Sequence, residues 1–520
     1  MASHTSLFTS AFVHHNLYKD SVALMRVAHR LLAIPDVVNA TLQMGNPANK
    51  EILQEAGLLI GDVKDAGPSD VMVVVQGKTQ AACDAAVTES MSDLAGKSNS
   101  SQESGSATQA VAARTVGMGL AALQTANIAQ ISVPGIYAAA EALKAVKAGL
   151  NVFMFSDNVP LAQEITIKKE AQKRGVLVMG PDCGTAIIGG VPLGFANTVR
   201  RGAIGIVAAS GTGLQEVTTQ IHRMGGGISH AIGTGGRDVY AEVGGITMLQ
   251  GIALLAGDAS TKVIAIVSKP PAPEVTKKVM AALLASGKPA VVVFLGSDTK
   301  SASKQIHVVD TLVDCAAKAV KLLAIKNIAI SVYIMPARPT FSSSQRFLRA
   351  LYSGGTYAAE AQSLWAKSGL RVWSNVPLNK ALALTLAVAN PLKESKEHTA
   401  LDLGDDDFTV GRPHPMIDQT ARIDRLLKEA ADPTVRVILL DVVIGWGAHA
   451  DPATELAKAI IQAKKIASKG KRNLAIIGFV CGTELDPQVL EKQETILQAA
   501  GMVLAGNSAN AAWLASTWVA

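Results

Sequence analysis

Short apolar runs alternate with amphipathic stretches along most of the chain, and this alternation predicts its fold. Runs such as Val71–Val75, Val263–Val267 and Val437–Leu440 have the length of buried strands and are too short to cross a membrane. Stretches with apolar residues at helical spacing follow many of them. A strand followed by a helix and another strand indicates a parallel sheet covered by helices. We therefore predict an α/β fold built from several parallel-sheet domains.

The same pattern divides the 520 residues into four units. Residues 1–95 alternate short strands and helices and are expected to form a small α+β domain. A Ser- and Gly-rich stretch at 96–109 is the clearest linker. Residues 110–198 are predicted to form a Rossmann-like domain. Residues 199–336 and 340–520 are predicted to form two further parallel-sheet domains of the flavodoxin-like kind.

The most informative segment is Ala203–Gly213, where an apolar strand ends in a small-residue turn and passes into an amphipathic helix. The turn consists of Ser210, Gly211, Thr212 and Gly213. Free backbone N–H groups and the helix dipole point at whatever occupies such a turn, which suits a phosphate. A tight turn capped by Thr212, with no ligand, is the alternative interpretation.

Two other glycine-rich turns follow apolar strands. One lies at Ile232–Asp238, after the next strand along the chain, and is expected beside the first turn at one sheet edge. The other follows the strand Val435–Ile444. Together with Ser210–Gly213 these turns are predicted to bind phosphate through backbone N–H groups. The glycines concerned are Gly233, Gly235, Gly236, Gly445 and Gly447.

Candidates for substrate contacts lie near these turns. A guanidinium binds two oxygens of a carboxylate at once, so Arg237 and Arg412 are predicted to hold a substrate carboxylate. A further candidate for an anion is the start of a predicted helix, which equally fits a capped helix without a ligand. That segment consists of Ser353, Gly354, Gly355 and Thr356.

Two histidines are candidates for proton transfer. His449 lies two residues after Gly447, and His414 lies beside Arg412 in a Pro-flanked segment. Solvent-facing loop histidines are the alternative. Asp405–Asp407 could hold Mg²⁺, but consecutive acidic residues more often form a solvated loop, and we assign no metal.

Composition narrows the class of protein. The net charge is +6, aromatic residues make up 4%, and no basic stripe is interleaved with aromatics, so we expect no nucleic-acid partner but allow small anionic substrates. The four cysteines are far apart and show neither metal spacing nor a disulfide framework. Cys183 and Cys481 each follow a strand and could be nucleophiles or small buried residues. With no cleavable signal apparent, a cytoplasmic protein is expected.

Several motifs resemble those of succinyl-CoA synthetase. Residues 128–336 resemble its α subunit through Ile131–Pro134, Gly180–Cys183, Ile204–Thr212 and Ile232–Gly236. Residues 398–515 resemble the C-terminal domain of its β subunit, with Leu401–Gly404 where that family has an acidic-glycine loop. The whole chain, including Phe155–Asn158 and Leu351–Thr356, resembles FdrA-type proteins of the acyl-CoA synthetase superfamily.

The chain also departs from succinyl-CoA synthetase. No ATP-grasp region fits between Pro336 and His398, so the chain is not expected to bind ATP by itself. That enzyme family moves a phosphohistidine between sites, but only His307 falls near its place here. A helix-surface histidine is the better interpretation of His307. The loop that would bind the phosphates of CoA is not recognisable, so CoA stays a possible ligand only. Phosphate is the expected substrate.

The resemblance to FdrA-type proteins implies a role in cytoplasmic allantoin catabolism. Such a protein would be one subunit of a hetero-oligomeric carbamoyltransferase that interconverts an oxalurate-like ureido acid plus phosphate with oxamate plus carbamoyl phosphate. A succinyl-CoA-ligase-like acyl-CoA synthetase with a separate ATP-grasp partner is the first alternative. A non-catalytic scaffold subunit is the second.

Overall fold

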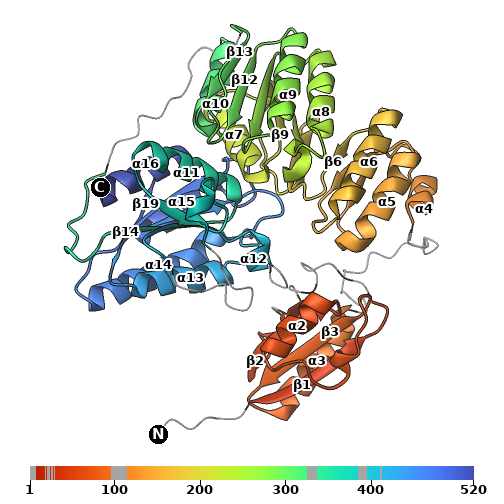
Figure 1. Cartoon of the computed structure of the whole chain (residues 1–520). Coiled ribbons are helices and arrows are strands. Elements are labelled where there is room, and N and C mark those ends of the chain that lie inside the picture. Colours follow the sequence, from red (N-terminus) through yellow and green to blue (C-terminus); the bar gives the residue numbers. More distant parts are fainter. Residues whose placement is uncertain are drawn as a thin grey trace. The chain divides into compact units, whose positions relative to one another are not determined.

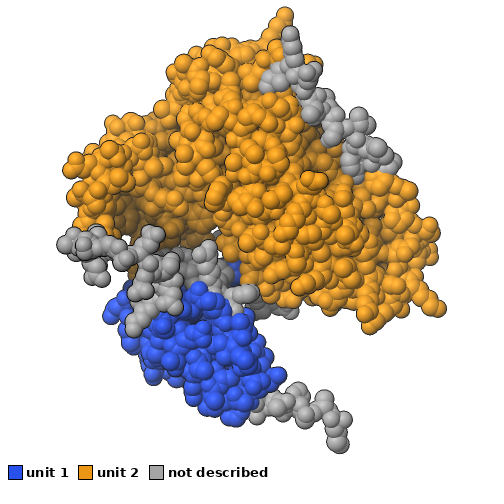
Figure 2. Space-filling model, turned by 180° about the vertical axis from the view of Figure 1, so that it is seen from behind, with its two compact units in different colours: residues 1–112, 387–391, 406–413 blue, residues 113–386, 392–405, 414–520 orange. Residues whose placement is uncertain are grey.

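The computed structural model describes residues 7–17, 30–94, 115–301, 303–324, 336–384, 395–409 and 413–520, with positions 19, 24, 27, 28 and 113. The chain forms two compact units, coloured separately in Figure 2. One comprises residues 1–112, 387–391 and 406–413. The other comprises residues 113–386, 392–405 and 414–520.

The first unit is built on a three-stranded antiparallel sheet in the order β1-β3-β2. The central strand β3 is apolar along its whole length because both faces of the sheet are covered. Cys83 and Ala86 of α3 pack on one face, and Leu53 of α2 packs on the other. The elements are β1 (Phe8–His14), β2 (Val37–Met44), α2 (Pro47–Glu55), η1 (Gly61–Lys64), β3 (Val71–Gly77) and α3 (Gln80–Leu94); the short α12 (Asp406–Thr409) also falls in this unit.

The second unit begins with a small parallel sheet in the order β4-β5-β6. Its helix α6 ends at Gly175, whose φ of 68° is the left-handed conformation that glycine adopts most easily after a helix. The elements are α4 (Val116–Ala122), β4 (Ile128–Ile131), α5 (Gly135–Lys147), β5 (Asn151–Met154), α6 (Leu161–Arg174) and β6 (Val178–Met179).

A seven-stranded sheet follows, in the order β13-β12-β11-β9-β10-β7-β8. The first five strands in this order are parallel, whereas the hairpin β7–β8 joins antiparallel to β10 and lies before residue 199, where this domain was expected to begin. Helices α7 and α10 cover one face, and α8 and α9 cover the other. The elements are β7 (Thr185–Ile188), β8 (Val191–Gly194), β9 (Arg201–Ala208), α7 (Gly211–Arg223), β10 (Ile228–Gly233), η2 (Gly236–Val239), α8 (Ile246–Gly257), β11 (Val263–Ser268), α9 (Pro273–Ala285), β12 (Ala290–Phe294), β13 (Ile306–Val309) and α10 (Leu312–Leu322).

The last sheet has six parallel strands in the order β15-β16-β14-β17-β18-β19. Helices α11 and α16 pack on one face, while α13 contacts β14 and β17 and packs against α14. The elements are β14 (Phe347–Tyr352), α11 (Gly355–Lys367), β15 (Val372–Ser374), η3 (Lys380–Leu382), β16 (His398–Asp402), α13 (Thr420–Ala431), β17 (Val435–Val443), α14 (Pro452–Lys469), β18 (Ala475–Cys481), α15 (Leu490–Ala499), β19 (Met502–Leu504) and α16 (Ser508–Val519).

Four helices lie between the two large sheets and share one apolar core (Figure 1). α7 and α10 belong to the seven-stranded sheet, and α11 and α16 belong to the six-stranded sheet. α11 contacts α7 directly, and α10 contacts α16. This layer confirms the predicted α/β architecture and brings the starts of α7 and α11 together. No helix among the described residues is both long and apolar enough to span a membrane.

Candidate functional site

The first turns of α7 and α11 meet at their N-terminal ends. Ser210, rather than Thr212, caps α7: its Oγ accepts the N–H of Gly213 at 2.9 Å. The same hydroxyl is hydrogen-bonded to the hydroxyl of Thr356 in the first turn of α11. α11 begins after Gly354, which has no side chain to cap it. Two helix starts with orphan N–H groups therefore converge on one place.

Small residues make this close approach possible. A Cβ atom on Gly354 would lie 2.3 Å from Cγ2 of Thr212, and one on Gly213 would lie 2.9 Å from Cγ2 of Thr356. Both distances are far below van der Waals contact. Glycine is therefore required at both positions for the two helices to meet, which accounts for the Gly-Thr pattern at each helix start.

Lys269 adds a positive charge beside the two helix starts. It directly follows β11, the strand next to β9 in the sheet. Its Nζ lies 2.8 Å from the position that a Cβ on Gly355 would occupy. An ammonium group and the N-terminal ends of two helices all favour an anion, so this corner of the fold attracts negative charge.

Asp402 approaches the same helix start from β16. Its Oδ1 accepts the N–H of Gly404 at 3.0 Å, and its Oδ2 lies 2.7 Å from the Cβ position of Gly355. The residue is 6% exposed. Burial raises the pKa of this carboxyl to about 7, against the opposing effect of the Lys269 charge. Asp402 therefore titrates in the neutral range, as functional carboxyl groups often do.

His414 faces the loop that follows Asp402. Its Nδ1 accepts the N–H of Met416 at 3.2 Å, so the neutral ring carries its hydrogen on Nε2. That Nε2 lies 2.6 Å from the Cβ position of Gly404. Burial, together with the charge of Arg422, lowers the pKa of His414 to about 4. At neutral pH the residue is thus a neutral hydrogen-bond donor rather than a cation.

A buried ion pair fixes Ser353, the residue before Gly354. Asp441 accepts both the backbone N–H and the hydroxyl of Ser353, the former at 2.9 Å. Arg422 donates to the Asp441 carboxylate at 3.0 Å, and both side chains are almost fully buried. A carboxylate that is hydrogen-bonded on every side holds its partners rigidly. Ser353 is therefore oriented by Asp441 and not free to bind a ligand through its hydroxyl.

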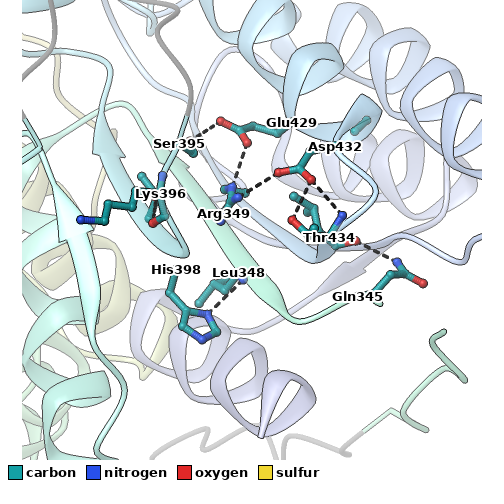
Figure 3. Close-up of polar contacts among 12 residues, drawn as sticks. Gln345, Leu348, Arg349, Ser395, Lys396, His398, Glu429, Asp432 and Thr434 are labelled. Carbon is teal, nitrogen blue, oxygen red and sulfur yellow. Dashed lines mark hydrogen bonds and ion pairs between the residues drawn. The ribbon is translucent and has the colours of Figure 1, made fainter. Parts of the chain in front are cut away.

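β14, which ends directly before Ser353, is anchored near its start by a second buried network (Figure 3). Arg349 of β14 donates to Glu429 of α13 at 2.9 Å and to Asp432 at 3.0 Å. The hydroxyl of Ser395 also donates to Glu429. Breaking one partner of a buried ion pair leaves an uncompensated charge, so this network ties α13 to β14 strongly.

The other predicted phosphate turns are occupied by protein groups. The N–H of Gly445 donates to Gln488, and the next residue, Trp446, donates to the carbonyl of Ala196. Gly447 lies against Phe195, whose ring centroid is 5.5 Å from that of His414. The Gly445–Gly447 turn thus packs against residues 194–197, and no contact joins it to Ser210 among the described residues. The start of α11, rather than this turn, contacts Ser210.

The turn after β10 is packed against the loop that follows β6. A Cβ on Gly233 would lie 2.3 Å from the carbonyl oxygen of Thr185, and one on Gly235 would lie 2.2 Å from that of Pro181. Gly236 has open space around it but lies in the same turn. Gly233 and Gly235 therefore serve close packing of two chain segments, and the phosphate contact predicted for Gly236 stays a prediction.

Arg237 belongs to a buried charge network instead of facing a substrate. Its guanidinium lies 2.9 Å from Glu164, and it donates to the carbonyl of Val159. Glu164 is also paired with Lys168, which bridges to Asp238 at 2.8 Å. Arg412, the other predicted carboxylate ligand, lies outside the described residues.

The ring of His449 forms polar contacts at the start of α14. Its Nδ1 accepts the N–H of Asp451 at 3.0 Å, and its Nε2 lies 3.7 Å from Glu455. Its backbone N–H donates to the carbonyl of Met416. These contacts describe a loop-stabilising histidine, so of the two predicted proton-transfer residues only His414 faces the helix starts.

The two cysteines considered as nucleophiles are inert. Cys183 and Cys481 are both buried. Burial raises the pKa of Cys183 to about 12 and that of Cys481 well above the usual value. A thiol reacts as its thiolate, so neither is prepared for nucleophilic attack at neutral pH. His307 lies within β13 and is paired with β12, so it belongs to the sheet and not to a helix surface.

Sequence reasoning missed Lys269 and gave Asp402 no role of its own. Lys269 carries no motif, but its position directly after a buried parallel strand was a usable signal. The carboxyl ends of parallel strands meet at one edge of a sheet, where ligands bind. Asp402 lies at the same kind of strand end, as the last residue of β16.

Three family models match parts of the chain. Residues 199–296 match a model described as CoA binding domain, and residues 351–518 match one described as CoA-ligase. Residues 7–111 match a model described as AllF, heavy metal-associated domain. The start of α7 thus lies within the match to the CoA binding domain, and the start of α11 lies within the match to the CoA-ligase model.

The chain is 40% identical to YahF of Escherichia coli strain K12, described as an uncharacterized protein, over 97% of each chain. It belongs to the YahF family. The ADP-forming succinate–CoA ligase subunit alpha 2 of Archaeoglobus fulgidus is 27% identical over 28% of this chain and 50% of that relative. The dinucleotide-forming acetyl-coenzyme A synthetase 1 of Ca. Korarchaeum cryptofilum superposes with a TM-score of 0.31, at 14% identity, over 76% of this chain and 84% of that one.

The described residues of the first unit show no metal site of the kind that its family model suggests. Among the residues that the structure describes, no three His, Cys, Asp or Glu side chains come together. Its cysteine, Cys83, is buried, and burial raises the pKa of its thiol. The Sγ of Cys83 donates to the carbonyl of Phe8. The described side chains of this unit therefore do not fit a thiolate-bound metal.

Proposed function

We propose that the chain is one subunit of a phosphate-dependent carbamoyltransferase and that phosphate binds where α7 and α11 meet. The observation that carries the proposal is the convergence of two helix starts, joined through Ser210 and Thr356, beside the ammonium of Lys269. Backbone N–H groups and one cation suit a phosphate or an acyl phosphate. Membership of the YahF family and the CoA-ligase-type domains are consistent with chemistry at an acyl carbon.

The reaction proposed is the phosphorolysis of an oxalurate-like ureido acid. An oxygen of HPO₄²⁻ forms a bond to the carbamoyl carbon, and the bond between that carbon and the amide nitrogen of oxamate breaks. The proton carried by the phosphate ends on that nitrogen, so carbamoyl phosphate and oxamate leave. Donors around the helix starts, including Nε2–H of His414, would stabilise charge that develops on the carbonyl oxygen.

An acyl-CoA synthetase that works with a separate ATP-grasp partner is the second candidate. The family models described as CoA binding domain and CoA-ligase favour it. A ligase of this type that relays its phosphoryl group through a mobile histidine needs one beside the site. His307 is held in β13, and among the described histidines His414 is the one that contacts the loop at Gly404. This placement favours the carbamoyltransferase.

The two candidates are separated by one assay. The full chain, purified together with the proteins encoded beside it, is incubated with oxalurate and phosphate, and carbamoyl phosphate and oxamate are measured. Carbamoyl phosphate that forms without ATP or CoA supports the carbamoyltransferase. If turnover needs both ATP and CoA and yields a thioester, the ligase replaces it. If phosphate does not bind and neither reaction occurs, a scaffold subunit remains.

A further inference from the structure

The mostly buried carboxyl group of Asp402 stands among the hydrogen-bond donors of this site. Asp402 is 6% exposed, and its Oδ1 is occupied by the N–H of Gly404. No described residue donates a hydrogen bond to its Oδ2, which points at the first residue of α11. An oxygen of a mostly buried carboxyl group that no described donor engages is available to a ligand group.

The other side chains at this place are mainly donors. Lys269 offers an ammonium, and His414 offers Nε2–H because its Nδ1 is already an acceptor. The hydroxyls of Ser210 and Thr356 bind each other. These groups and the two helix starts suit phosphate and carbonyl oxygens. Asp402 supplies an acceptor, which a carbonyl oxygen does not need. The P–OH of HPO₄²⁻ can donate to such an acceptor, whereas the fully ionised phosphoryl group of a carbamoyl phosphate has no proton to donate.

A carbamoyl group differs from an acetyl group of the same shape in one respect. It carries an NH₂ where the acetyl group carries a methyl, and the two N–H bonds need acceptors when the group is buried. We propose that Oδ2 of Asp402 accepts this NH₂ and makes the site specific for a carbamoyl over an acyl phosphate. This inference rests on the proposed function, because it assumes that phosphate lies at the starts of α7 and α11.

The size of the preference for a carbamoyl group follows from the cost of leaving Oδ2 of Asp402 without a hydrogen-bond donor. When a methyl group takes the place of NH₂, Oδ2 loses its partner while it remains buried. A site that is built to hydrogen-bond a substrate N–H rejects an analogue lacking that group more strongly than an apolar pocket rejects an extra methylene. Asp402 would thus act as a specificity-determining residue, while Lys269 and the helix starts hold the phosphate in both cases.

The test uses two stable analogues that differ only at this group. Phosphonoacetamide carries the NH₂, and 2-oxopropylphosphonate carries a methyl in its place. Calorimetric titration of the full chain with each analogue gives an affinity ratio. We expect phosphonoacetamide to bind about 10-fold tighter or more. This comparison needs no variant, so it does not depend on whether a substituted protein folds.

The variant Asp402→Asn then assigns the preference to one atom. The asparagine oxygen can still accept the N–H of Gly404, while its NH₂ puts a donor where Oδ2 was. The affinity ratio should fall to about 1 or reverse, since two NH₂ groups would oppose each other. Asp405→Asn removes a neighbouring carboxylate of the same loop and serves as the matched control. It should keep the wild-type ratio.

The outcomes separate this inference from the function on which it rests. Equal binding of both analogues by the wild type, or an unchanged ratio in Asp402→Asn, overturns the role of Asp402 while phosphate binding at the helix starts stands. If both affinities fall alike in Asp402→Asn, the residue has a structural role and the inference is wrong. If neither analogue nor inorganic phosphate binds the wild type, the proposed site and the inference fail together.

Discussion

The hydroxyl of Ser210, which caps α7, is hydrogen-bonded to the hydroxyl of Thr356 in the first turn of α11. This bond joins two helices that belong to different sheets and start 144 residues apart, at Gly211 and Gly355. Helix starts rarely face each other, because their partial positive charges repel. An anion between them would remove this repulsion, and the predictions below depend on that arrangement.

Gly354→Ala should weaken phosphate binding, because its Cβ would lie 2.3 Å from Cγ2 of Thr212 and force the helix starts apart. We expect affinity for phosphate, measured by calorimetry, to fall about 10-fold or more, with a loss of stability of about 1–3 kcal/mol from overpacking. Gly257→Ala, at the end of α8 where a Cβ meets nothing within 4 Å, is the control. Thr212→Ala combined with Gly354→Ala should restore part of the binding, because only the Cβ of residue 212 then lies near the new methyl group, at 3.0 Å. No restoration would contradict the steric account.

Lys269→Met should lower the affinity for phosphate while leaving the fold intact. A hydrogen bond from a charged group contributes about 1.5–3 kcal/mol, so a loss of about 10- to 100-fold is expected. The interaction is electrostatic, and the wild type should lose affinity as salt is added more steeply than the variant does. Lys277→Met, on the exposed side of α9, is the matched control. Equal affinities for Lys269→Met and wild type would remove this residue from the site.

The two candidate histidines should behave differently. His414→Gln loses the neutral Nε2–H donor in its present position, and we expect carbamoyl phosphate formation to fall about 100-fold, as for other transition-state donors. His449→Asn keeps an acceptor for the N–H of Asp451 and should retain most activity. Because burial lowers the pKa of His414 to about 4, the histidine should not titrate between pH 5 and 8. A large loss in His449→Asn alone would reverse the assignment.

The raised pKa of Glu360 predicts how the stability of the folded protein depends on pH. Burial raises the pKa of its carboxyl to about 7 from 4.5. A carboxyl group whose pKa is higher in the folded protein than in the unfolded chain stabilises the folded state. This contribution is fully present below the pKa of the unfolded chain and disappears as pH rises through about 7. The melting temperature of the wild type should therefore fall between about pH 4.5 and 7.5, corresponding to a loss of up to about 3 kcal/mol.

The variant Glu360→Gln isolates this effect. Its oxygen can still accept the N–H of Leu312, and its amide can donate to Ser508, so the packing is kept. The melting temperature of this variant should vary less with pH than that of the wild type. Glu274→Gln, at an exposed position of α9, is the control and should follow the wild type. Parallel curves for Glu360→Gln and wild type would show that the carboxyl does not titrate in this range.

Much of the fold could be predicted because strands and helices leave local patterns. The apolar runs predicted as strands at Val71–Val75 and Val263–Val267 form most of β3 and β11. Asp451 and Pro452 start α14 as an N-cap and first-turn pair. The same pair at Asp486 does not start a helix, because its carboxylate accepts hydrogen bonds from Asn197 and Thr198. A contact between residues so far apart in the chain leaves no local signal.

The candidate site was harder to predict for the same reason. Ser210–Gly213 was recognisable because a helix start is a local feature. Its partner, Ser353–Thr356, was named as a further candidate, but its pairing with Ser210 was not predicted, since several glycine turns follow strands and only the packing of two sheets selects Gly354. The turn at Gly445 has a similar sequence, yet Gln488 takes up its N–H. Sequence alone could not show which of these amides stay open.

The shared helix layer determines how the assembly of the site depends on protein concentration. Its two helix starts lie on one polypeptide, whereas the matched succinate–CoA ligase relative is named as a single subunit of its enzyme. Two halves on one chain meet with an effective concentration that does not depend on how much protein is present. The anion-binding corner should therefore stay assembled at nanomolar protein, even where association with other chains has been lost.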